Sequence, residues 1–423
     1  MIPLIKFPSR LDYSGLCERP QIESSLIGNL VERIFEKVKT EKDEALFSLT
    51  YEFEKRKIDA ILYTEKEINA YSEATDENLK KAIQIAYDNI YKFHEAQILV
   101  EKRIETSPGV VCWQKSSPIE KVGIYIPGGT APLFSTILML AIPAKIAGCT
   151  EIVLCTPGTH PAIFYTAKLC GITKMCKIGG AQAIAALALG TLTIPKVYKI
   201  FGPGNQYVTA AKMYANSLGV AIDMPAGPSE VAIYADETSN PRFVASDLLS
   251  QAEHGIDSQV FLVSTSEFLI NETIHELENQ LINLPRKELA KKAILNSKFI
   301  LVKNSEDAID LLNEYAAEHL ILACDEPEKI ADKMINAGSI FLGHFTPESA
   351  GDYASGTNHT LPTNGHARAY SGVNLDSFCK KITLQSISKS GLEILSHSII
   401  PMAEAESLQA HANAVKVRLE NGL

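Results

Sequence analysis

The sequence lacks the features that would carry a chain into a membrane or out of the cell. Its first ten residues do not combine a charged start with an apolar core and a small-residue cleavage site. The longest apolar stretch, residues 131–147, is interrupted by two prolines, two hydroxyl side chains and a lysine, so it cannot span a bilayer. We therefore expect a cytoplasmic protein with no membrane partner.

Clustered positive charge and metal-type cysteine spacings are also missing. The formal net charge is −10 at pH 7 and no Lys/Arg-rich face is evident, which argues against nucleic acid or anionic lipid as a partner. The 8 cysteines contain no Cys-x-x-Cys pair, so zinc bound by thiolates is not expected. We interpret the cysteines as reduced thiols, and those in apolar segments as small core residues.

The sequence does contain enough apolar residues to form more than one hydrophobic core. At 423 residues the chain is too long for a single compact core, so two or three domains are expected. Hydrophobic residues make up 46% and charged residues 21%, which argues against disorder. Residues 22–97 place apolar side chains at helical spacing with Glu and Lys between them, and this pattern predicts surface helices.

From about residue 122, short β-rich runs alternate with alanine-rich helical runs. This alternation predicts a parallel sheet with helices on its faces. The expected strands are 122–126, 151–155, 175–178, 197–201 and 220–224, and the expected helices are 134–147, 162–170, 181–189 and 205–218.

Four small-residue loops follow these strands, at the carboxyl edge where such sheets bind ligands. They cover residues 125–129, 179–182, 202–205 and 225–229. In Gly202-Pro-Gly-Asn205 the glycines permit unusual backbone angles, and Asn205 can cap the next helix. A turn of this kind offers free N–H groups to an anion. The alternative is an ordinary strand-to-helix turn.

A second alternating series predicts another α/β layer. Its expected strands are 230–234, 259–263, 299–302 and about 339–342, and its expected helices are 241–254, 267–284 and 308–319. The expected fold class is therefore α/β, with two Rossmann-like parallel-sheet domains, one inserted in the other, plus a helical N-terminal region and a C-terminal arm. The expected boundaries are an N-terminal extension of 1–20, a discontinuous domain of 21–121 and 230–373, an inserted domain of 122–229, and an arm of 374–423 with a helix over 402–419.

Polar residues at two expected helix ends could do chemistry. Gln251 and His254 are three positions apart on one helix face, a spacing that suits two ligands of one metal ion, although a His before Gly also suits a C-terminal cap. Glu318 and His319 close the expected helix 308–319. A carboxylate and an imidazole there could serve as acid and base, or could simply face solvent.

Two further segments add carboxylates and imidazoles. The long polar loop 346–374 contains Asp352 and His359, and long loops of this kind are often functional. Asp, His and Gln donors together suit zinc or a similar divalent ion. On a straight C-terminal helix, Glu404 would share a face with His411, whereas Glu406 would lie elsewhere.

Six motifs together closely resemble histidinol dehydrogenases, in the family's order and over most of the chain. They are Val122-Gly-Ile-Tyr-Ile-Pro-Gly-Gly129, Gly202-Pro-Gly-Asn205, Asp223-Met-Pro-Ala-Gly-Pro-Ser-Glu230, Ser250-Gln-Ala-Glu-His254, Ala317-Glu-His-Leu320 and Gly356-Thr-Asn-His359. The resemblance implies an NAD-dependent, four-electron oxidation of L-histidinol to L-histidine through L-histidinaldehyde, the last steps of histidine biosynthesis, with one zinc ion per subunit orienting the substrate.

The resemblance also implies roles for single residues. Glu318 would activate the water that adds to the aldehyde, and His319 would take up protons. The implied zinc ligands are Gln251, His254, Asp352 and His411. The implied substrate contacts are Ser229, Gln251, His254, His319, Asp352, His359, Glu406 and His411. The implied NAD contacts, in the inserted domain, are Tyr125, Gln182 and Asn205.

In the family, two chains form a homodimer with shared sites, so the arm carrying Glu406 and His411 would enter the partner's site. The family pattern thus favours Glu406 over Glu404, against the straight-helix geometry. No Gly-x-Gly-x-x-Gly follows the first strand of the inserted domain, which predicts that NAD is held differently than in common dinucleotide-binding folds. A zinc hydrolase using Glu318 and His319, or a non-catalytic binding scaffold, are the alternatives.

Overall fold

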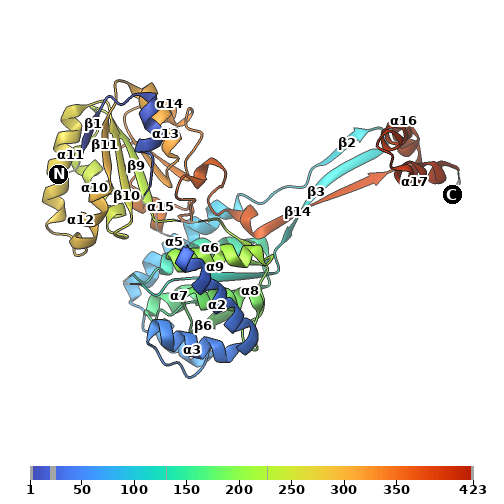
Figure 1. Ribbon diagram of the computed structural model, residues 1–423, viewed down its shortest axis with the longest axis horizontal. Helices are drawn as coiled ribbons and strands as arrows, with labels where there is room; N and C mark the ends of the chain where they lie inside the picture. Colours follow the sequence, from blue (N-terminus) through green and yellow to red (C-terminus); the bar gives the residue numbers. More distant parts are fainter. Residues whose placement is uncertain (1–2, 20–24, 130, 226, 421–423) are drawn as a thin grey trace. The chain divides into compact units, whose positions relative to one another are not determined.

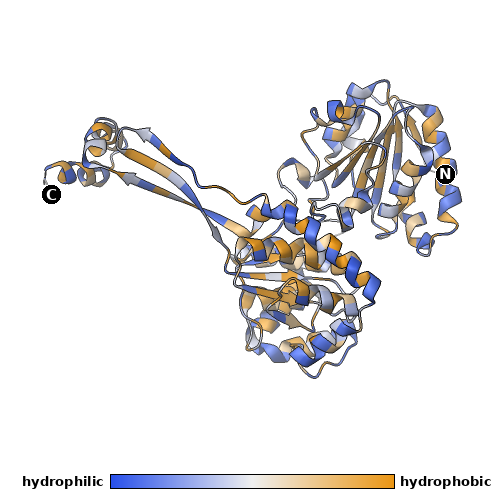
Figure 2. Ribbon diagram, turned by 180° about the vertical axis from the view of Figure 1, so that it is seen from behind, coloured by the Kyte–Doolittle hydropathy of each residue, from blue (hydrophilic) through white to orange (hydrophobic). Residues whose placement is uncertain are grey.

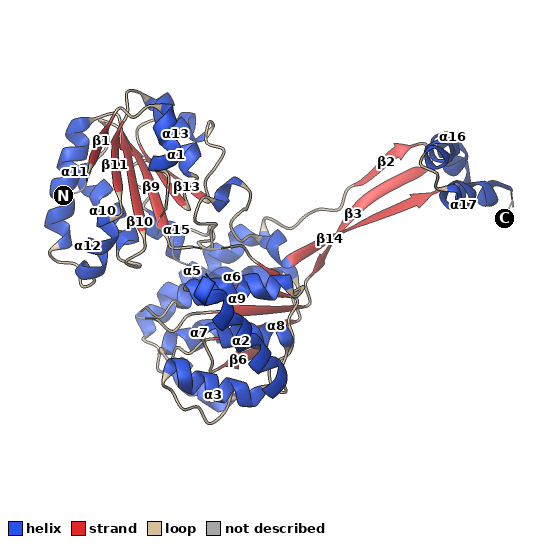
Figure 3. Cartoon of the chain, viewed as in Figure 1, coloured by secondary structure: helices blue, strands red, loops and turns tan. Residues whose placement is uncertain are grey.

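The computed structural model describes residues 3–19, 25–129, 131–225 and 227–420 (Figure 1). The chain divides into two units, one of residues 1–97 with 119–378 and one of residues 98–118 with 379–423. The larger unit contains two parallel sheets with helices on their faces, and the smaller unit contains an antiparallel sheet and two helices (Figure 3). The expected α/β class is confirmed.

The first sheet of the larger unit has 5 parallel strands in the order β6-β5-β4-β7-β8. The strands are β4 (Lys121–Tyr125), β5 (Glu151–Cys155), β6 (Lys174–Cys176), β7 (Lys199–Phe201) and β8 (Ala221–Ile222). The connecting helices are α6 (Phe134–Ala147), α7 (Pro161–Leu169), α8 (Gly180–Leu189) and α9 (Gln206–Ser217). All predicted strands and helices of this series are present, with small shifts at their ends.

The second sheet has 6 parallel strands in the order β1-β11-β10-β9-β12-β13. The strands are β1 (Leu4–Lys6), β9 (Glu230–Ala235), β10 (Gln259–Ser264), β11 (Lys298–Leu301), β12 (His319–Ala323) and β13 (Ser339–Leu342). The helices are α1 (Tyr13–Leu16), α10 (Pro241–Ala252), α11 (Glu267–Leu281), α12 (Lys287–Leu295), α13 (Ser305–Tyr315), α14 (Pro327–Ala331) and α15 (Glu348–Tyr353). In Figure 2 the strands of both sheets are largely apolar, as expected for sheets covered on two faces.

The prediction of one helix over residues 308–319 is wrong. Helix α13 ends at Tyr315, because Ala316 takes a left-handed conformation with φ 52°. Glu318 then precedes β12, which starts at His319 and lies between β9 and β13. The following Leu320-Ile-Leu322 is a short apolar run, and such a run suits a buried strand as well as a helix. Glu318 and His319 therefore lie at the amino end of a central strand.

The N-terminal 97 residues also differ from expectation. Residues Leu4–Lys6, expected in an extension, form β1 and pair with β11 at the edge of the second sheet. The helices α2 (Ser25–Glu41), α3 (Asp43–Glu54), α4 (Glu65–Glu73) and α5 (Glu77–Glu95) were expected to join the second sheet. Instead, α2 and α3 share a core with α8, while α4 and α5 pack on α7 and α6. An amphipathic pattern defines a buried face but not the surface that covers it.

The smaller unit contains the strands β2 (Arg103–Ser107), β3 (Val110–Pro118) and β14 (Cys379–Ile387), in the antiparallel order β14-β3-β2. The expected arm, residues 374–423, is thus joined by residues 98–118. Helices α16 (Lys389–Ala405) and α17 (Gln409–Glu420) replace the single expected helix. Ser407 has φ 61°, which breaks the helix next to Glu406, so the straight-helix comparison of Glu404 with His411 does not apply.

Within the part of the chain that the structure describes, three short 3-10 helices remain: Arg10–Asp12, His366–Arg368 and Leu375–Phe378. Across the described ranges, the helices are all too short or too polar to traverse a lipid bilayer.

Candidate functional site

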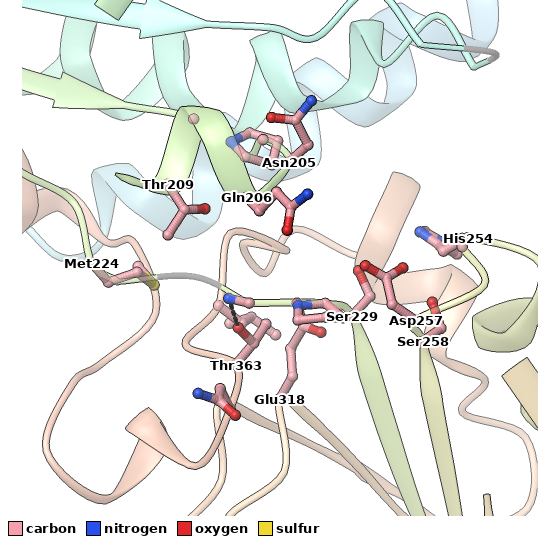
Figure 4. A pocket seen from close by; sticks show the side chains of 18 of the residues that line it. Asn205, Gln206, Thr209, Met224, Ser229, His254, Asp257, Ser258, Glu318 and Thr363 are labelled. Atoms are coloured by element: carbon pink, nitrogen blue, oxygen red, sulfur yellow. Dashed lines mark hydrogen bonds between the residues drawn. The ribbon is translucent and has the colours of Figure 1, made fainter. Parts of the chain in front are cut away.

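A cavity of about 770 Å³, lined by both polar and apolar groups, lies within the larger unit (Figure 4). One wall is the carboxyl edge of the first sheet, which contributes Gly202–Asn205. Other lining residues come from the amino edge of the second sheet, where Ser229 precedes β9, Ser258 precedes β10 and Glu318 precedes β12. Further lining residues come from a loop around His359 and from Ile27 and Gly28 of α2. The first sheet thus uses the edge predicted for ligands, and the second sheet uses the opposite edge.

The loop Gly202–Asn205 is held in place by a buried ion pair. Lys212 Nζ lies 2.5 Å from Asp223 Oδ1 and donates to the carbonyl oxygen of Gly202 at 2.9 Å. Asp223 Oδ2 in turn accepts from the N–H of Gly202 at 2.8 Å. Gly202 has φ 128°, and a Cβ at this position would collide with the carbonyl oxygen of Tyr125. Both the charges and the glycine therefore fix the loop that enters the cavity.

Glu318 and His319 are both buried and lie side by side, with 3.6 Å between His319 Nδ1 and Glu318 Oε2. Glu318 Oε2 accepts from the backbone N–H of Glu230 at 2.9 Å, and His319 Nδ1 lies 3.3 Å from the carbonyl oxygen of the same residue. Burial raises the pKa of Glu318 to about 8, although His319 opposes the shift. A carboxyl with this pKa can exchange protons near neutral pH.

The imidazole of His319 faces several carboxylates. Its Nε2 lies 3.5 Å from Asp352 Oδ1. Burial alone would lower the pKa of His319, but the charges of Glu348, Glu318 and Asp352 outweigh it and raise the pKa to about 10. The same burial raises the pKa of Glu348 well above its usual range. This concentration of buried acidic groups calls for a compensating positive charge.

Beside this pair, His254, Glu348 and Asp352 bring their ligand atoms within 4.8 Å of one another. Gln251, with its amide nitrogen toward Glu348, donates to that carboxylate and accepts from the N–H of Glu230 at 3.0 Å. Carboxylate, imidazole and amide donors at such spacing fit a divalent ion such as zinc. Three of the four expected zinc ligands are thus gathered in the larger unit, together with Glu348.

Glu348 is a residue that the sequence did not single out. It stands four positions before Asp352 at the start of α15, so both side chains occupy one helix face. The four-residue spacing of Glu348 and Asp352 within the long polar loop could have predicted that both carboxylates belong to the site.

His359 lies against both the cluster and the first sheet's helices. Its Nδ1 is 2.8 Å from the carbonyl oxygen of Asp352, so Nδ1 carries the proton and donates. Its Nε2 is then the acceptor for the hydroxyl of Thr136, on α6, at 3.0 Å. Ser229 and His359 both line the cavity, and their expected roles as substrate contacts stay predictions.

The expected NAD contacts are in different environments. Asn205 lines the cavity and caps α9 by accepting from the N–H groups of Tyr207 and Val208. Tyr125 and Gln182 are buried and, within the described ranges, do not belong to the cavity lining. The Tyr125 hydroxyl accepts from Gly180 N–H, and the Gln182 amide donates to Glu54 at 3.0 Å.

Glu406 and His411 belong to the smaller unit. Glu406 caps the end of α16, His411 lies in α17, and both side chains are exposed. Their expected roles in the site stay predictions.

The fold and the site together define an α/β protein with two parallel sheets, in which a buried carboxyl and a buried imidazole lie beside a cluster of metal-type ligands. Residues 17–419 match the family model described as histidinol dehydrogenase. A histidinol dehydrogenase of Bacteroides thetaiotaomicron is 55% identical over 424 residues, covering 99% of each chain. One of Vibrio parahaemolyticus is 50% identical and covers 96% of this chain and 95% of that one.

The crystal structure of a histidinol dehydrogenase from Elizabethkingia anophelis has a TM-score of 0.97 and 53% identity, covering 99% of this chain and 98% of that one. The chain therefore belongs to the histidinol dehydrogenase family, a family of oxidoreductases. The resemblance seen in the sequence motifs is confirmed.

Proposed function

We propose that this protein oxidises L-histidinol to L-histidine through L-histidinaldehyde, with NAD⁺ as electron acceptor, in the last steps of histidine biosynthesis in the cytoplasm. The observation that carries the proposal is the buried pair of Glu318 and His319, 3.6 Å apart, of which Glu318 lines the cavity of a chain in this family. Oxidation of an alcohol to an acid needs one group to take up protons and one to activate water. A carboxyl and an imidazole supply both.

When bound, NAD⁺ would accept a hydride in each oxidation step, and zinc would orient the substrate. Glu318 would take a proton from the water that adds to the aldehyde, a task suited to a carboxyl whose pKa burial raises to about 8. His319 would take up the protons released around each hydride transfer. The carboxylates that raise the pKa of His319 would also face the zinc ion. A bound cation would offset part of their negative charge and so lower the pKa of His319 toward the range in which a neutral imidazole can accept a proton.

Zinc would be held by Gln251, His254 and Asp352, with His411 supplied by the second chain of a homodimer. Clustering of His254 and Asp352 supports the first part of this set. The remaining substrate contacts would come from Ser229, His359 and, on the arm, Glu406. Residues 122–229 would bind NAD through Tyr125, Gln182 and Asn205, of which Asn205 has the strongest support because it lines the cavity.

The purified protein, incubated with histidinol, NAD⁺ and zinc, tests the proposal. We expect NADH to accumulate in a ratio of two per histidine formed, and removal of metal by a chelator to stop the reaction until zinc is returned. Absence of NADH in the zinc-loaded protein would contradict the proposal. Hydrolysis of an amide or ester without NADH would favour a zinc hydrolase instead.

A further inference from the structure

Arg19, which follows α1, makes an unusually complete set of contacts. Its Nη2 donates to Glu230 Oε2 at 2.6 Å and to the carbonyl oxygen of Tyr315 at 2.6 Å. Its Nε lies 3.2 Å from Glu230 Oε2, and its Nη1 donates to the carbonyl oxygen of Cys17 at 3.2 Å. The guanidinium also stacks on the Tyr315 ring, 4.1 Å from its centre. Only 13% of the Arg19 side chain and 2% of the Glu230 side chain are exposed.

The two segments held by Arg19 are those that flank Glu318 and His319. Glu230 begins β9, and its backbone contacts both residues: its N–H donates to Glu318 and its carbonyl oxygen lies against His319 Nδ1. Tyr315 ends α13, three residues before Glu318. One guanidinium therefore ties the neighbouring strand to the helix end that leads into the acid–base pair.

The Glu230 carboxylate reaches a third segment of the site. Its Oε1 accepts from the backbone N–H of Asn364, in the loop that follows His359. The same loop is tied to the strand connection by Thr363, whose hydroxyl accepts from the N–H of Gly227 (Figure 4). A shift of Glu230 would thus displace both the pair Glu318 and His319 and the loop that lines the cavity.

We propose that Arg19 is a positioning residue for Glu318 and His319, acting through Glu230. The inference rests on the proposed function, since it concerns the same acid–base pair. A planar guanidinium suits the task because it can donate to a carboxylate and a backbone carbonyl at once while it stacks on a ring. The ammonium of a lysine keeps the charge but cannot hold this planar arrangement.

The expected effect is on turnover more than on cofactor binding. A displacement of reacting groups by about 1 Å can cost on the order of 100-fold in rate. The loop Gly202–Asn205, by contrast, is fixed independently by Lys212 and Asp223. We therefore expect loss of Arg19 to lower kcat by roughly 10- to 100-fold and to leave the KM for NAD⁺ within about threefold.

Arg19→Ala, Arg19→Lys and the control Arg10→Met form a matched set. Arg10 lies in the same N-terminal segment and pairs with Asp310, but its side chain is 71% exposed and it does not contact Glu230 among the contacts described. Each variant is assayed with histidinol and NAD⁺, its melting temperature is measured, and Arg19→Ala is also assayed with added methylguanidinium. Activity of the unchanged protein is established first, so failure of the proposed function is recognised separately.

The proposal expects Arg19→Ala and Arg19→Lys to lose kcat while Arg10→Met does not, and methylguanidinium to restore part of the lost activity of Arg19→Ala. Equal kcat in Arg19→Lys and the unchanged protein would overturn it. So would a loss in Arg19→Ala that merely follows its unfolded fraction and is not restored by the guanidinium. If Arg19→Ala does not fold, the kcat of Arg19→Lys against Arg10→Met decides.

Discussion

Glu318 and His319 lie at the amino end of β12, and both contact the backbone of Glu230. The Glu318 carboxylate has a backbone N–H donor from Glu230, whereas the His319 imidazole faces Asp352. The two side chains lie 3.6 Å apart, but Glu318 is among the described residues that line the cavity and His319 is not. This difference is the physical basis for giving them separate roles.

Replacing Glu318 by Gln should slow aldehyde oxidation far more than replacing His319 by Asn. Gln keeps the size of the side chain and can still accept the Glu230 N–H, but it cannot take a proton from water. General-base groups contribute on the order of 100- to 10,000-fold, so a loss of that size is expected for NADH formation from histidinaldehyde. The two half-reactions can be followed separately from histidinol and from the aldehyde. Equal losses in both half-reactions for both variants would contradict the division of roles.

Asp247, one turn before Gln251 on α10, links burial to the pH dependence of stability. Burial raises its pKa from the ordinary 3.8 to about 7. Because the folded-state pKa is the higher one, the folded protein keeps a proton that the unfolded chain loses. The contribution of this bound proton to the free energy of unfolding is fully present below pH 3.8 and is lost as pH rises through about 7.

Asp247→Asn should therefore gain stability relative to the unchanged protein as pH rises from about 4 to about 7, by on the order of 2–4 kcal/mol. Urea denaturation across this pH range measures the difference. Asp332→Asn, at an exposed position after α14, is the control and should not show the trend. A difference that stays constant with pH would rule out this account of Asp247.

Among the elements, the loop between β7 and α9 depends on charges that lie beneath it. The side chains of Lys212 and Asp223 are 3% and 1% exposed, and both bind the backbone of Gly202. Removing one partner of such a pair leaves a buried charge without compensation, at a cost of about 3–5 kcal/mol. Removing both charges together avoids that cost.

We expect Lys212→Met to destabilise the protein by about 3–5 kcal/mol and to raise the KM for NAD⁺, because the loop carrying Asn205 loses its anchor. The double variant with Asp223→Asn should recover part of the stability, since the amide oxygen that replaces the carboxylate can still accept from the N–H of Gly202. Denaturation curves and NAD⁺ titrations of single and double variants measure both effects. If the loss of unfolding free energy in the double variant equals the sum of the losses in the two single variants, the two charges do not compensate each other and the prediction is wrong.

The elements also show what a single sequence can and cannot specify. The βα series over residues 122–229 was predictable because each unit combines a short buried strand with an apolar helix; α6 begins and ends where its pattern does. Strand β12 was missed because three apolar residues fit strand or helix equally well. Strands β2 and β14 were missed because their mostly exposed residues give little hydrophobic alternation.

For the site, the sequence motifs identified candidate residues, but they did not predict the contacts or the burial of those residues. Gln251, His254 and Asp352 could be named from motifs, and the structure gathers His254 and Asp352 with Glu348. Arg19 and Glu230 are 211 residues apart in sequence, and no local sequence spacing predicts that they are in contact. The burial that raises the pKa of Glu318 likewise depends on the packed fold rather than on neighbouring residues.

At the scale of the whole molecule, the zinc set proposed here is divided between the two units. Gln251, His254 and Asp352 belong to the larger unit, while His411 belongs to the smaller one. An arm that carries a ligand can serve either its own chain or the partner, and the two arrangements differ in what mixed subunits can do. The proposal of a homodimer with exchanged arms therefore makes a prediction that a subunit-mixing experiment can measure.

His254→Ala and His411→Ala should each be inactive alone, yet active when the two chains are refolded or expressed together. In an exchanged dimer, the chain with intact His254 receives an intact arm from the His254→Ala chain, so each mixed dimer has one complete site. Random pairing makes half the dimers mixed, which gives about a quarter of the unchanged protein's activity. If each arm served its own chain, every site in the mixture would lack one ligand and no activity would return. Two copies of the same variant, treated in parallel, control for recovery by refolding alone.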